Sequence, residues 1–201
     1  GDVYKRQANG VQQGDRVAAF LPNSIEAIIA MLATSALGAI WCSASPDFGA
    51  DGVLDRFGQI DPKVLFCTNG YYYGGKWIDC EEKNAAVAKA LPSLTASFSI
   101  DYHAQDDCAF RTQLAQFPAK DIDFARLPFD HPLFIMFSSG TTGKPKCMVH
   151  GVGGTLIQHL KEIMLHCDCH TNDKLFFYTT CSWMMWHWKV STLATGACVV
   201  L

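Results

Sequence analysis

The sequence predicts an α/β fold in which strands and helices alternate around a largely parallel sheet. Three observations support this fold class. Apolar runs of strand length alternate with longer segments of helical pattern, and the connections between them are short. Hydrophobic residues make up 49% of the 201 residues and charged residues 17%, which is ample material for a buried core. Small polar residues directly follow one apolar run, as they do where ligands bind at the carboxyl ends of parallel strands.

The alternation is clearest in the first half of the chain. Asn23 or Ser24 is suited to cap a helix that runs to Leu37, with Glu26 in its first turn and Gly38 at its C-terminal end. The elements expected after this helix are a strand at 39–42, a helix at 50–60, a strand at 63–68, a loop at 69–75, a helix at 77–91 and a strand at 97–100.

The second half begins with residues 101–132, whose weak periodicity predicts an irregular connection. The elements expected beyond it are a strand at 133–138, a polar loop, a strand at 147–150, a helix at 155–167, a strand at 174–179, a helix at 183–193 and a strand at 197–201. Residues 1–10 are expected to form a tail foreign to the domain, and residues 11–201 to form part of one domain.

Composition excludes several classes of function. The net charge is −3 and there is no basic run, which argues against a nucleic-acid partner. The nine cysteines, an odd number, and the lack of a secretory leader favour a reduced, cytoplasmic setting. The uncharged run 27–46 is close to the length of a membrane span, but its hydroxyl residues and Gly38 favour a buried helix followed by a strand. No protein partner is evident.

The polar stretch FSSGTTGKPK (137–146) has the composition of a phosphate-holding loop. It does not fit the P-loop pattern, because Ser138 stands where that pattern needs Gly and Pro145 where it needs Ser or Thr. It does not fit the nucleophile elbow either, because Phe137 replaces the first Gly. Hydroxyls, backbone N–H groups and lysines all suit phosphate oxygens. An ordinary polar turn remains the alternative from composition alone.

This stretch resembles the signature of the adenylate-forming enzymes, which include the acyl-CoA synthetases. Within that superfamily, three stretches resemble the acetoacetyl-CoA synthetases. They are SGTTGKPKCMVHGVGGTLIQHLKEIMLHCD (139–168), CSASPDFGADGVLDRFGQIDPKVLF (42–66) and TTCSWMMWHWKVSTLATGACVVL (179–201). The resemblance covers most of residues 11–201 and is thinnest over 78–129. It implies that the chain is a fragment of the large N-terminal AMP-binding domain of that fold.

The family chemistry has two steps. A carboxylate attacks the α-phosphate of ATP to give an acyl-adenylate and pyrophosphate, and the thiol of coenzyme A then attacks the activated carbonyl. The resemblance therefore implies acetoacetate, ATP and coenzyme A as substrates, with Mg²⁺ bound to ATP. The family's catalytic lysine and acidic magnesium motif have no counterpart in these residues. We therefore expect no catalytic residue and no metal ligand here, and an inactive fragment.

The resemblance also assigns roles to individual residues. The ATP phosphates would be held by Ser139, Gly140, Thr141, Thr142, Gly143 and Lys144, with Lys146 beside them. The acyl pocket would be lined by Trp183, Met184, Met185 and His187, with ordinary core packing of a buried helix as the alternative. Coenzyme A would contact Tyr73 and Lys76, with a solvated turn as the alternative.

Other interpretations stay open. The HCDCH stretch (166–170) has the ligand types of a zinc site, but its spacing is too tight for one compact site. An acetyl- or propionyl-CoA synthetase is a competing enzyme, and a non-catalytic nucleotide-binding module is the competing non-enzyme. The WMMW stretch (183–186) favours the acetoacetate branch over the acetate enzymes, in which smaller residues usually follow that Trp.

Overall fold

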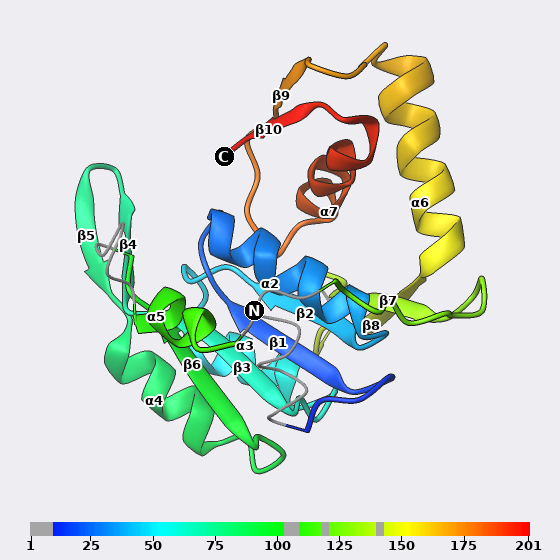
Figure 1. The fold of residues 1–201 in the computed structure, drawn as a ribbon. Coiled ribbons are helices and arrows are strands. Elements are labelled where there is room, and N and C mark those ends of the chain that lie inside the picture. The colour runs from blue at the N-terminus through cyan, green and yellow to red at the C-terminus, as the bar shows by residue number, and fades with distance from the viewer. Residues whose placement is uncertain (1–9, 103–108, 118–120, 140–142) are drawn as a thin grey trace.

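A six-stranded sheet forms the centre of the molecule. The computed structural model describes residues 10–102, 109–117, 121–139 and 143–201. The strand order is β6-β3-β1-β2-β7-β8 (Figure 1), and all neighbours are parallel except β7 and β8. The strands are β1 (Arg16–Phe20), β2 (Ile40–Ala44), β3 (Val64–Thr68), β6 (Ala96–Ile100), β7 (Pro132–Phe137) and β8 (Cys147–Gly151). The predicted α/β class with a largely parallel sheet is confirmed, although β1 was not among the expected strands.

Helices cover both faces of this sheet because side chains alternate along each buried strand. In β1, Val17 and Ala19 point to one hydrophobic core, and Ala18 and Phe20 point to the other. The helices packed on the first core are α2 (Ile25–Ala36), α5 (Ala109–Ala115) and α7 (Met184–Ser191). The helices packed on the second core are α3 (Ala50–Phe57) and α4 (Glu81–Lys89). The sheet is therefore the middle of three layers.

The ends of α2 follow from the local sequence. Ser24 caps the helix, since its Oγ accepts a hydrogen bond from the Ala27 backbone N–H at 3.2 Å. Gly38 follows the last helical turn with φ +69°, a conformation that favours glycine. A Cβ at Gly38 would lie 2.8 Å from Leu127 Cδ2. Both capping predictions are confirmed, and the uncharged run 27–46 forms a helix followed by a strand. Across the described residues, no helix is long and apolar enough to cross a membrane.

Residues 70–79 correct two expectations. They form a hairpin of β4 (Gly70–Tyr73) and β5 (Lys76–Asp79), where we expected a loop and the start of a helix. Gly74 and Gly75 make the turn with φ of 56° and 76°, as a two-residue hairpin turn with two positive φ angles requires. The Gly-Gly pair between two aromatic-rich runs is the signal that predicts this hairpin. The helix begins only at Glu81.

The C-terminal part rises away from the six-stranded sheet (Figure 1). Here α6 (Val152–Leu160) continues into the π-helix η1 (Lys161–His166), and the 3₁₀ helix η2 (Thr192–Thr195) extends α7. Strands β9 (Lys174–Phe176) and β10 (Cys198–Val200) pair in parallel as a separate sheet and are shorter than expected. A third core joins these elements through Ile163, Cys169, Trp188 and Ala197. The prediction that residues 101–132 form only an irregular connection was also wrong in one part, because α5 lies within this stretch.

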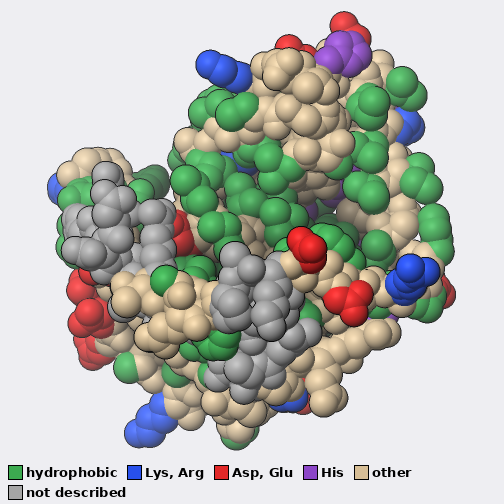
Figure 2. Space-filling view, viewed as in Figure 1, with side chains coloured by type: hydrophobic (Ala, Val, Ile, Leu, Met, Phe, Trp, Pro, Cys, Tyr) green, Lys and Arg blue, Asp and Glu red, His purple; other side chains and the backbone are tan. Residues whose placement is uncertain are grey.

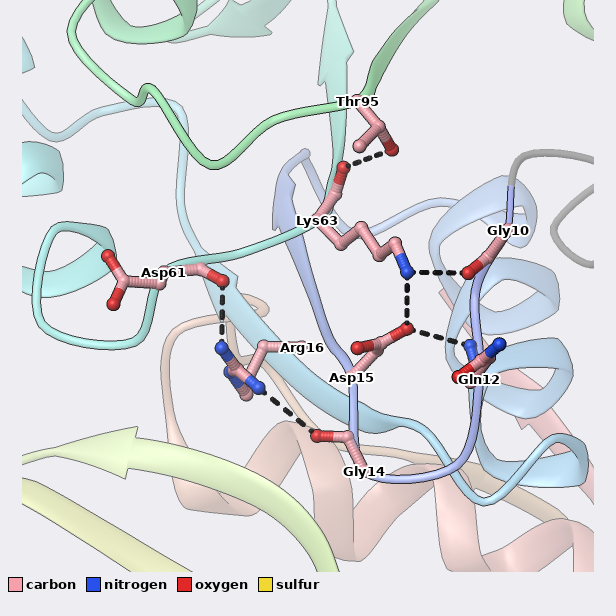
Figure 3. Close-up of polar contacts among 8 residues, drawn as sticks. All are labelled: Gly10, Gln12, Gly14, Asp15, Arg16, Asp61, Lys63 and Thr95. Atoms are coloured by element: carbon pink, nitrogen blue, oxygen red, sulfur yellow. Dashed lines mark hydrogen bonds and ion pairs between the residues drawn. The ribbon is translucent and has the colours of Figure 1, made fainter.

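The amino ends of β1 and β3 are joined by a polar cluster (Figure 3). Lys63 Nζ donates to the Gly10 carbonyl at 2.6 Å and pairs with Asp15 Oδ2 at 3.0 Å. Arg16 donates to the carbonyl oxygens of Gly14 at 3.3 Å and Asp61 at 3.0 Å. These contacts join the loops at the amino ends of the strands. Ligands of parallel α/β sheets bind at the opposite, carboxyl ends of the strands. Gly10, which we assigned to the tail, contacts the domain here.

Candidate functional site

The polar loop 138–146 lies at the carboxyl end of β7, which runs parallel to β2. The loop returns into β8 and is therefore the connection of a β-hairpin. Its base is closed by two hydrogen bonds between Ser138 and Lys146. The Ser138 backbone N–H donates to the Lys146 carbonyl at 3.0 Å, and the Lys146 backbone N–H donates to Ser138 Oγ at 3.0 Å. The Ser138 hydroxyl thus fixes the loop's base.

Helix α3 supports the far side of this loop. Gln59 Nε2, just beyond α3, donates to the carbonyl of Pro145 at 2.8 Å. Lys144 Nζ lies 3.4 Å from Asp55 Oδ1, and the Lys144 side chain is 78% exposed. An exposed ion pair of this kind contributes little, so it does not prevent Lys144 from turning toward an anion. Gly143 has a φ of +149°, which a residue with a side chain adopts only with strain.

The predicted phosphate-binding residues are placed unevenly by the structure. Ser139, Gly143, Lys144 and Lys146 lie on one exposed loop. Gly140, Thr141 and Thr142 lie outside the described residues. The described part offers a hydroxyl, backbone N–H groups and two exposed ammonium groups, and these are donors of the kind that phosphate oxygens accept.

The four predicted acyl-pocket residues separate into different environments at the start of α7. Trp183 is 66% exposed and Met184 43% exposed, whereas His187 is buried at 2%. Trp183 and Met185 line a cavity of about 310 Å³ with Phe177, Tyr178, Thr179 and Thr180, which we call the aromatic cavity. Met184 lines a second cavity of about 410 Å³. Consecutive helical residues point in different directions, which is why one stretch of sequence serves two cavities.

The second cavity, which we call the α6 cavity, is much more polar. It lies between the end of β8, helix α6 and the first residue of α7, and it is lined by Val149, His150, Gly151, Gly154, Thr155, Gln158, His159, Glu162 and Met184. Burial lowers the pKa of His150 and of His159, so both imidazoles are neutral near pH 7. Sequence analysis did not select Gln158, His159 or Glu162, although polar residues at helical spacing in this segment were the available signal.

His187 lies on the buried face of α7 and lines neither of these cavities. Its ring packs on Phe134 with 4.2 Å between ring centroids, and its Nδ1 lies 3.2 Å from the Trp183 carbonyl. Burial lowers its pKa to about 3, so the ring is neutral. Because a carbonyl only accepts, Nδ1 carries the proton, and Nε2 is an acceptor with no partner among the described residues. His187 therefore has no N–H left to offer a ligand.

The predicted coenzyme A residues flank the turn of the β4–β5 hairpin. Tyr73 and Lys76 pair across the two strands, and both are exposed. Next to them, Tyr72 and Trp77 form a cross-strand aromatic pair with 5.4 Å between ring centroids, and Tyr102 lies 6.1 Å from each of these rings. The hairpin thus presents one cation and an aromatic surface to solvent.

A buried polar cluster that sequence analysis missed anchors the start of α7. Lys189 has no exposed surface, and its Nζ lies 3.4 Å from Asn23 Oδ1, which also accepts from Trp186 Nε1 at 2.8 Å. Ser43 Oγ donates to the Cys181 carbonyl at 2.5 Å. A lysine inside the mostly apolar helical run 183–193 was the available signal. These contacts attach α7 and the segment before it to the carboxyl ends of β1 and β2.

The HCDCH stretch does not form a metal site in the described part of the chain. Cys167 is exposed, Cys169 is buried, and His170 Nε2 contacts Asp168 Oδ1 at 3.1 Å. Across the described ranges, no group of three or more His, Cys, Asp or Glu side chains is arranged to hold a metal ion. The eight cysteines that the structure describes are all free thiols.

Hydrophobic side chains gather over the upper part of Figure 2, where α6, α7, β9 and β10 lie. The exposed hydrophobic side chains of these elements and their connections include Leu156, Ile157, Leu165, Phe176, Tyr178 and Trp183. Large exposed apolar patches are unusual on monomeric proteins and often mark places where other protein surface packs.

Comparisons with known proteins agree with this geometry. Acetoacetyl-coenzyme A synthetase of Rhizobium meliloti is 51% identical over 97% of this chain. Malonamoyl-CoA synthetase of Penicillium aethiopicum is 46% identical over 95% of it. The solved structure of an acetoacetyl-CoA synthetase from Streptomyces lividans superposes with a TM-score of 0.93 at 44% identity, covering 99% of this chain and 31% of that one.

The chain spans only 31% of the Rhizobium protein and 28% of the Penicillium protein. The family of AMP-binding enzymes matches residues 6–201, which is almost the whole chain. The matched residues include the hairpin loop after β7, the lining of the aromatic cavity and of the α6 cavity, and the β4–β5 hairpin. This chain therefore belongs to the family of AMP-binding enzymes.

Proposed function

We propose that this chain is part of an ATP-dependent acetoacetate–CoA ligase that forms an acyl-adenylate and then transfers the acyl group to coenzyme A. The observation that carries the proposal is the identity of about half of all positions with acetoacetyl-CoA synthetases over almost the whole chain. The aligned region covers almost the whole chain, including the loop after β7 and the start of α7, where phosphate and acid would meet. The proposed catalytic lysine lies in sequence outside this chain.

The loop 139–146 would hold the β- and γ-phosphates of ATP. Negative charge develops on pyrophosphate as the carboxylate attacks the α-phosphate, and positioned donors stabilise that charge most effectively. Ser139, Gly140, Thr141, Thr142 and Gly143 supply hydroxyl and backbone donors in this proposal, and Lys144 and Lys146 supply the cations. The weak, exposed ion pair to Asp55 leaves Lys144 available for this role.

The N-terminal turn of α7 would shape the acyl pocket. Trp183, Met184 and Met185 border the two cavities, and large side chains there suit a short acid. Methionine adapts its shape to an irregular ligand surface. His187 supports this wall from behind through its contact with Phe134, rather than by a hydrogen bond to the acid.

The β4–β5 hairpin would contact coenzyme A through Tyr73 and Lys76. Lys76 is exposed beside the turn and is suited to a phosphate of the coenzyme. Mg²⁺ would neutralise the ATP phosphates when bound. The described residues provide no clustered carboxylates for it, so we assign its protein ligands to sequence outside this chain.

The remaining assignments are a cytoplasmic location and small-molecule partners. Free thiols at all eight described cysteines fit a reducing compartment. The net charge of −3 gives no support for a nucleic-acid partner. In a protein as long as these relatives, the part that this chain does not include would pack on the apolar surface around α6 and β10.

A second acid deserves a test because one relative at 46% identity is a malonamoyl-CoA synthetase. The measurement is kcat/KM for acetoacetate, malonamate, acetate and propionate in the full-length enzyme, followed by pyrophosphate release. The proposal expects acetoacetate to be used best. A preference for acetate or propionate would identify a different acyl-CoA synthetase, and no adenylation of any acid would favour a non-catalytic nucleotide-binding module.

A further inference from the structure

The α6 cavity contains groups of the kind that a β-keto acid requires, and hydrogen bonds within the cavity hold two of them in place. Acetoacetate differs from butyrate by one keto oxygen, and a buried oxygen of this kind needs a hydrogen-bond donor. The aromatic cavity is lined by Phe177, Tyr178, Thr179, Thr180, Trp183 and Met185, and the hydroxyls of Thr179 and Thr180 already have polar partners within the chain. The α6 cavity combines the apolar Met184 and Val149 with histidine and amide side chains.

The charges of the α6 cavity determine which end of the acid it accepts. Glu162 lines it, and neither Lys nor Arg is among its lining residues. A second carboxylate is disfavoured beside Glu162, so the carboxylate of the acid stays outside, where the nucleotide would be. His150 lies opposite Phe134 on β7, three residues along β8 from the end of the phosphate loop at Cys147. At the usual strand rise that separation is roughly 10 Å along β8, so the cavity and the end of the phosphate loop lie on the same strand.

Hydrogen bonds within the cavity limit which side chain donates. Ser191 Oγ donates its single proton to the His187 carbonyl at 3.2 Å. His159 Nδ1, at 2.9 Å from Ser191 Oγ, must therefore be the donor of that contact. With the ring neutral, His159 Nε2 is an acceptor and repels a keto oxygen. His159 thus lines the cavity without donating a hydrogen bond to the keto oxygen of the acid.

For Gln158, the hydrogen bonds fix the orientation of the side-chain amide and leave one of its N–H groups free to donate to a ligand. Its Nε2 donates to Glu162 Oε1 at 2.6 Å, one helical turn further along. A carboxylate only accepts, so the amide nitrogen must face Glu162, and the amide group carries a second N–H. Glu162 therefore holds the amide so that its other proton remains for a ligand.

We propose that the α6 cavity receives the acetyl end of acetoacetate, with the Gln158 amide donating to the keto oxygen and Glu162 positioning that amide. This inference rests on the proposed ligase function and adds the residue that selects a β-carbonyl acid. Gln158 is a specificity residue, and Glu162 acts through it. Malonamate carries a carbonyl oxygen at the same position as the keto oxygen of acetoacetate, and this oxygen would accept the same hydrogen bond from Gln158.

The experiment compares acids in the full-length enzyme. The measured quantity is the ratio of kcat/KM for acetoacetate to kcat/KM for butyrate in wild type, Gln158→Leu and Gln158→Met. Gln158 is exposed, so neither change disturbs a core. Losing a donor to a substrate oxygen lowers the ratio by about tenfold or more. The matched control is Gln12→Leu, an exposed glutamine next to the polar cluster of Figure 3, which leaves the ratio unchanged.

Glu162 has its own readout. Glu162→Leu lowers the ratio, and adding it to Gln158→Leu lowers the ratio no further, because both changes remove the same contact. An unchanged ratio in both Gln158 variants overturns the inference, as does an equal loss for both acids. A wild-type enzyme that does not ligate acetoacetate refutes the proposed function instead, so the two failures are distinguishable.

Discussion

Lys189 is a buried lysine without a carboxylate partner among the described residues, and its replacement by Met is the most informative test of the fold. Its side chain has no exposed surface, and its nearest described acceptor, Asn23 Oδ1 at 3.4 Å, is shared with Trp186. Burial lowers the pKa of Lys189, and the nearby Cys181 thiol partly opposes this. We expect Lys189→Met to stabilise the chain at neutral pH, because it replaces a poorly satisfied ammonium by an apolar side chain of similar length.

The size of the effect follows from proton linkage. In the unfolded chain, Lys189 takes up its proton at the ordinary lysine pKa of 10.5, whereas the folded chain takes it up only at lower pH. Below 10.5 the unfolded state therefore binds more protons, and the wild type loses stability as pH falls until the lowered pKa is passed. The loss is at most about 1.4 kcal/mol per pH unit, so it is at most about 3 kcal/mol between pH 9 and pH 7.

The comparison between wild type and Lys189→Met isolates this lysine, because the other shifted groups are present in both proteins. His187 affects stability below its ordinary pKa of 6.5, and buried thiols such as Cys42 and Cys181 affect it near and above 9.0. Urea unfolding of wild type and Lys189→Met, followed by tryptophan fluorescence at pH 7, 8 and 9, measures the difference. The exposed Lys161→Met is the control and keeps the wild-type profile. Parallel profiles for wild type and Lys189→Met would refute the reasoning.

Three further predictions concern acid stability, catalysis and capping. His187→Leu gains about 2 kcal/mol of stability relative to wild type between pH 7 and pH 5, because the buried ring resists protonation down to about pH 3; a pH-independent difference in urea unfolding contradicts this. Thr141→Ala with Thr142→Ala slows adenylation in the full-length enzyme by about 10²-fold or more, measured by pyrophosphate release, while thioester formation from preformed acyl-adenylate changes much less; equal losses point to misfolding. Ser24→Ala lowers the free energy of unfolding by about 1 kcal/mol, and no change would show that the bond from Ala27 contributes nothing.

Most of the fold was predictable from sequence because its signals are local. The cap at Ser24, the turn at Gly38 and the apolar runs of β2, β3 and β7 each depend on neighbouring residues and were placed within a few positions. The β4–β5 hairpin was missed because aromatic residues on both faces of a short ribbon hide the alternation of a strand. The resemblance in residues 139–146 likewise needed only the order of the residues.

The arrangement of the candidate site was decided by tertiary structure alone. The stretch 183–187 reads as one pocket in sequence, but the packing of α7 against β7 directs Met184 into one cavity, Trp183 and Met185 into another, and His187 against Phe134. The proton on His187 is placed by a carbonyl that only the folded helix brings to it. Sequence determines which side chains are present and which segments are strands or helices. Their direction, burial and protonation depend on contacts between residues far apart in the chain, and these form only when the layers pack together.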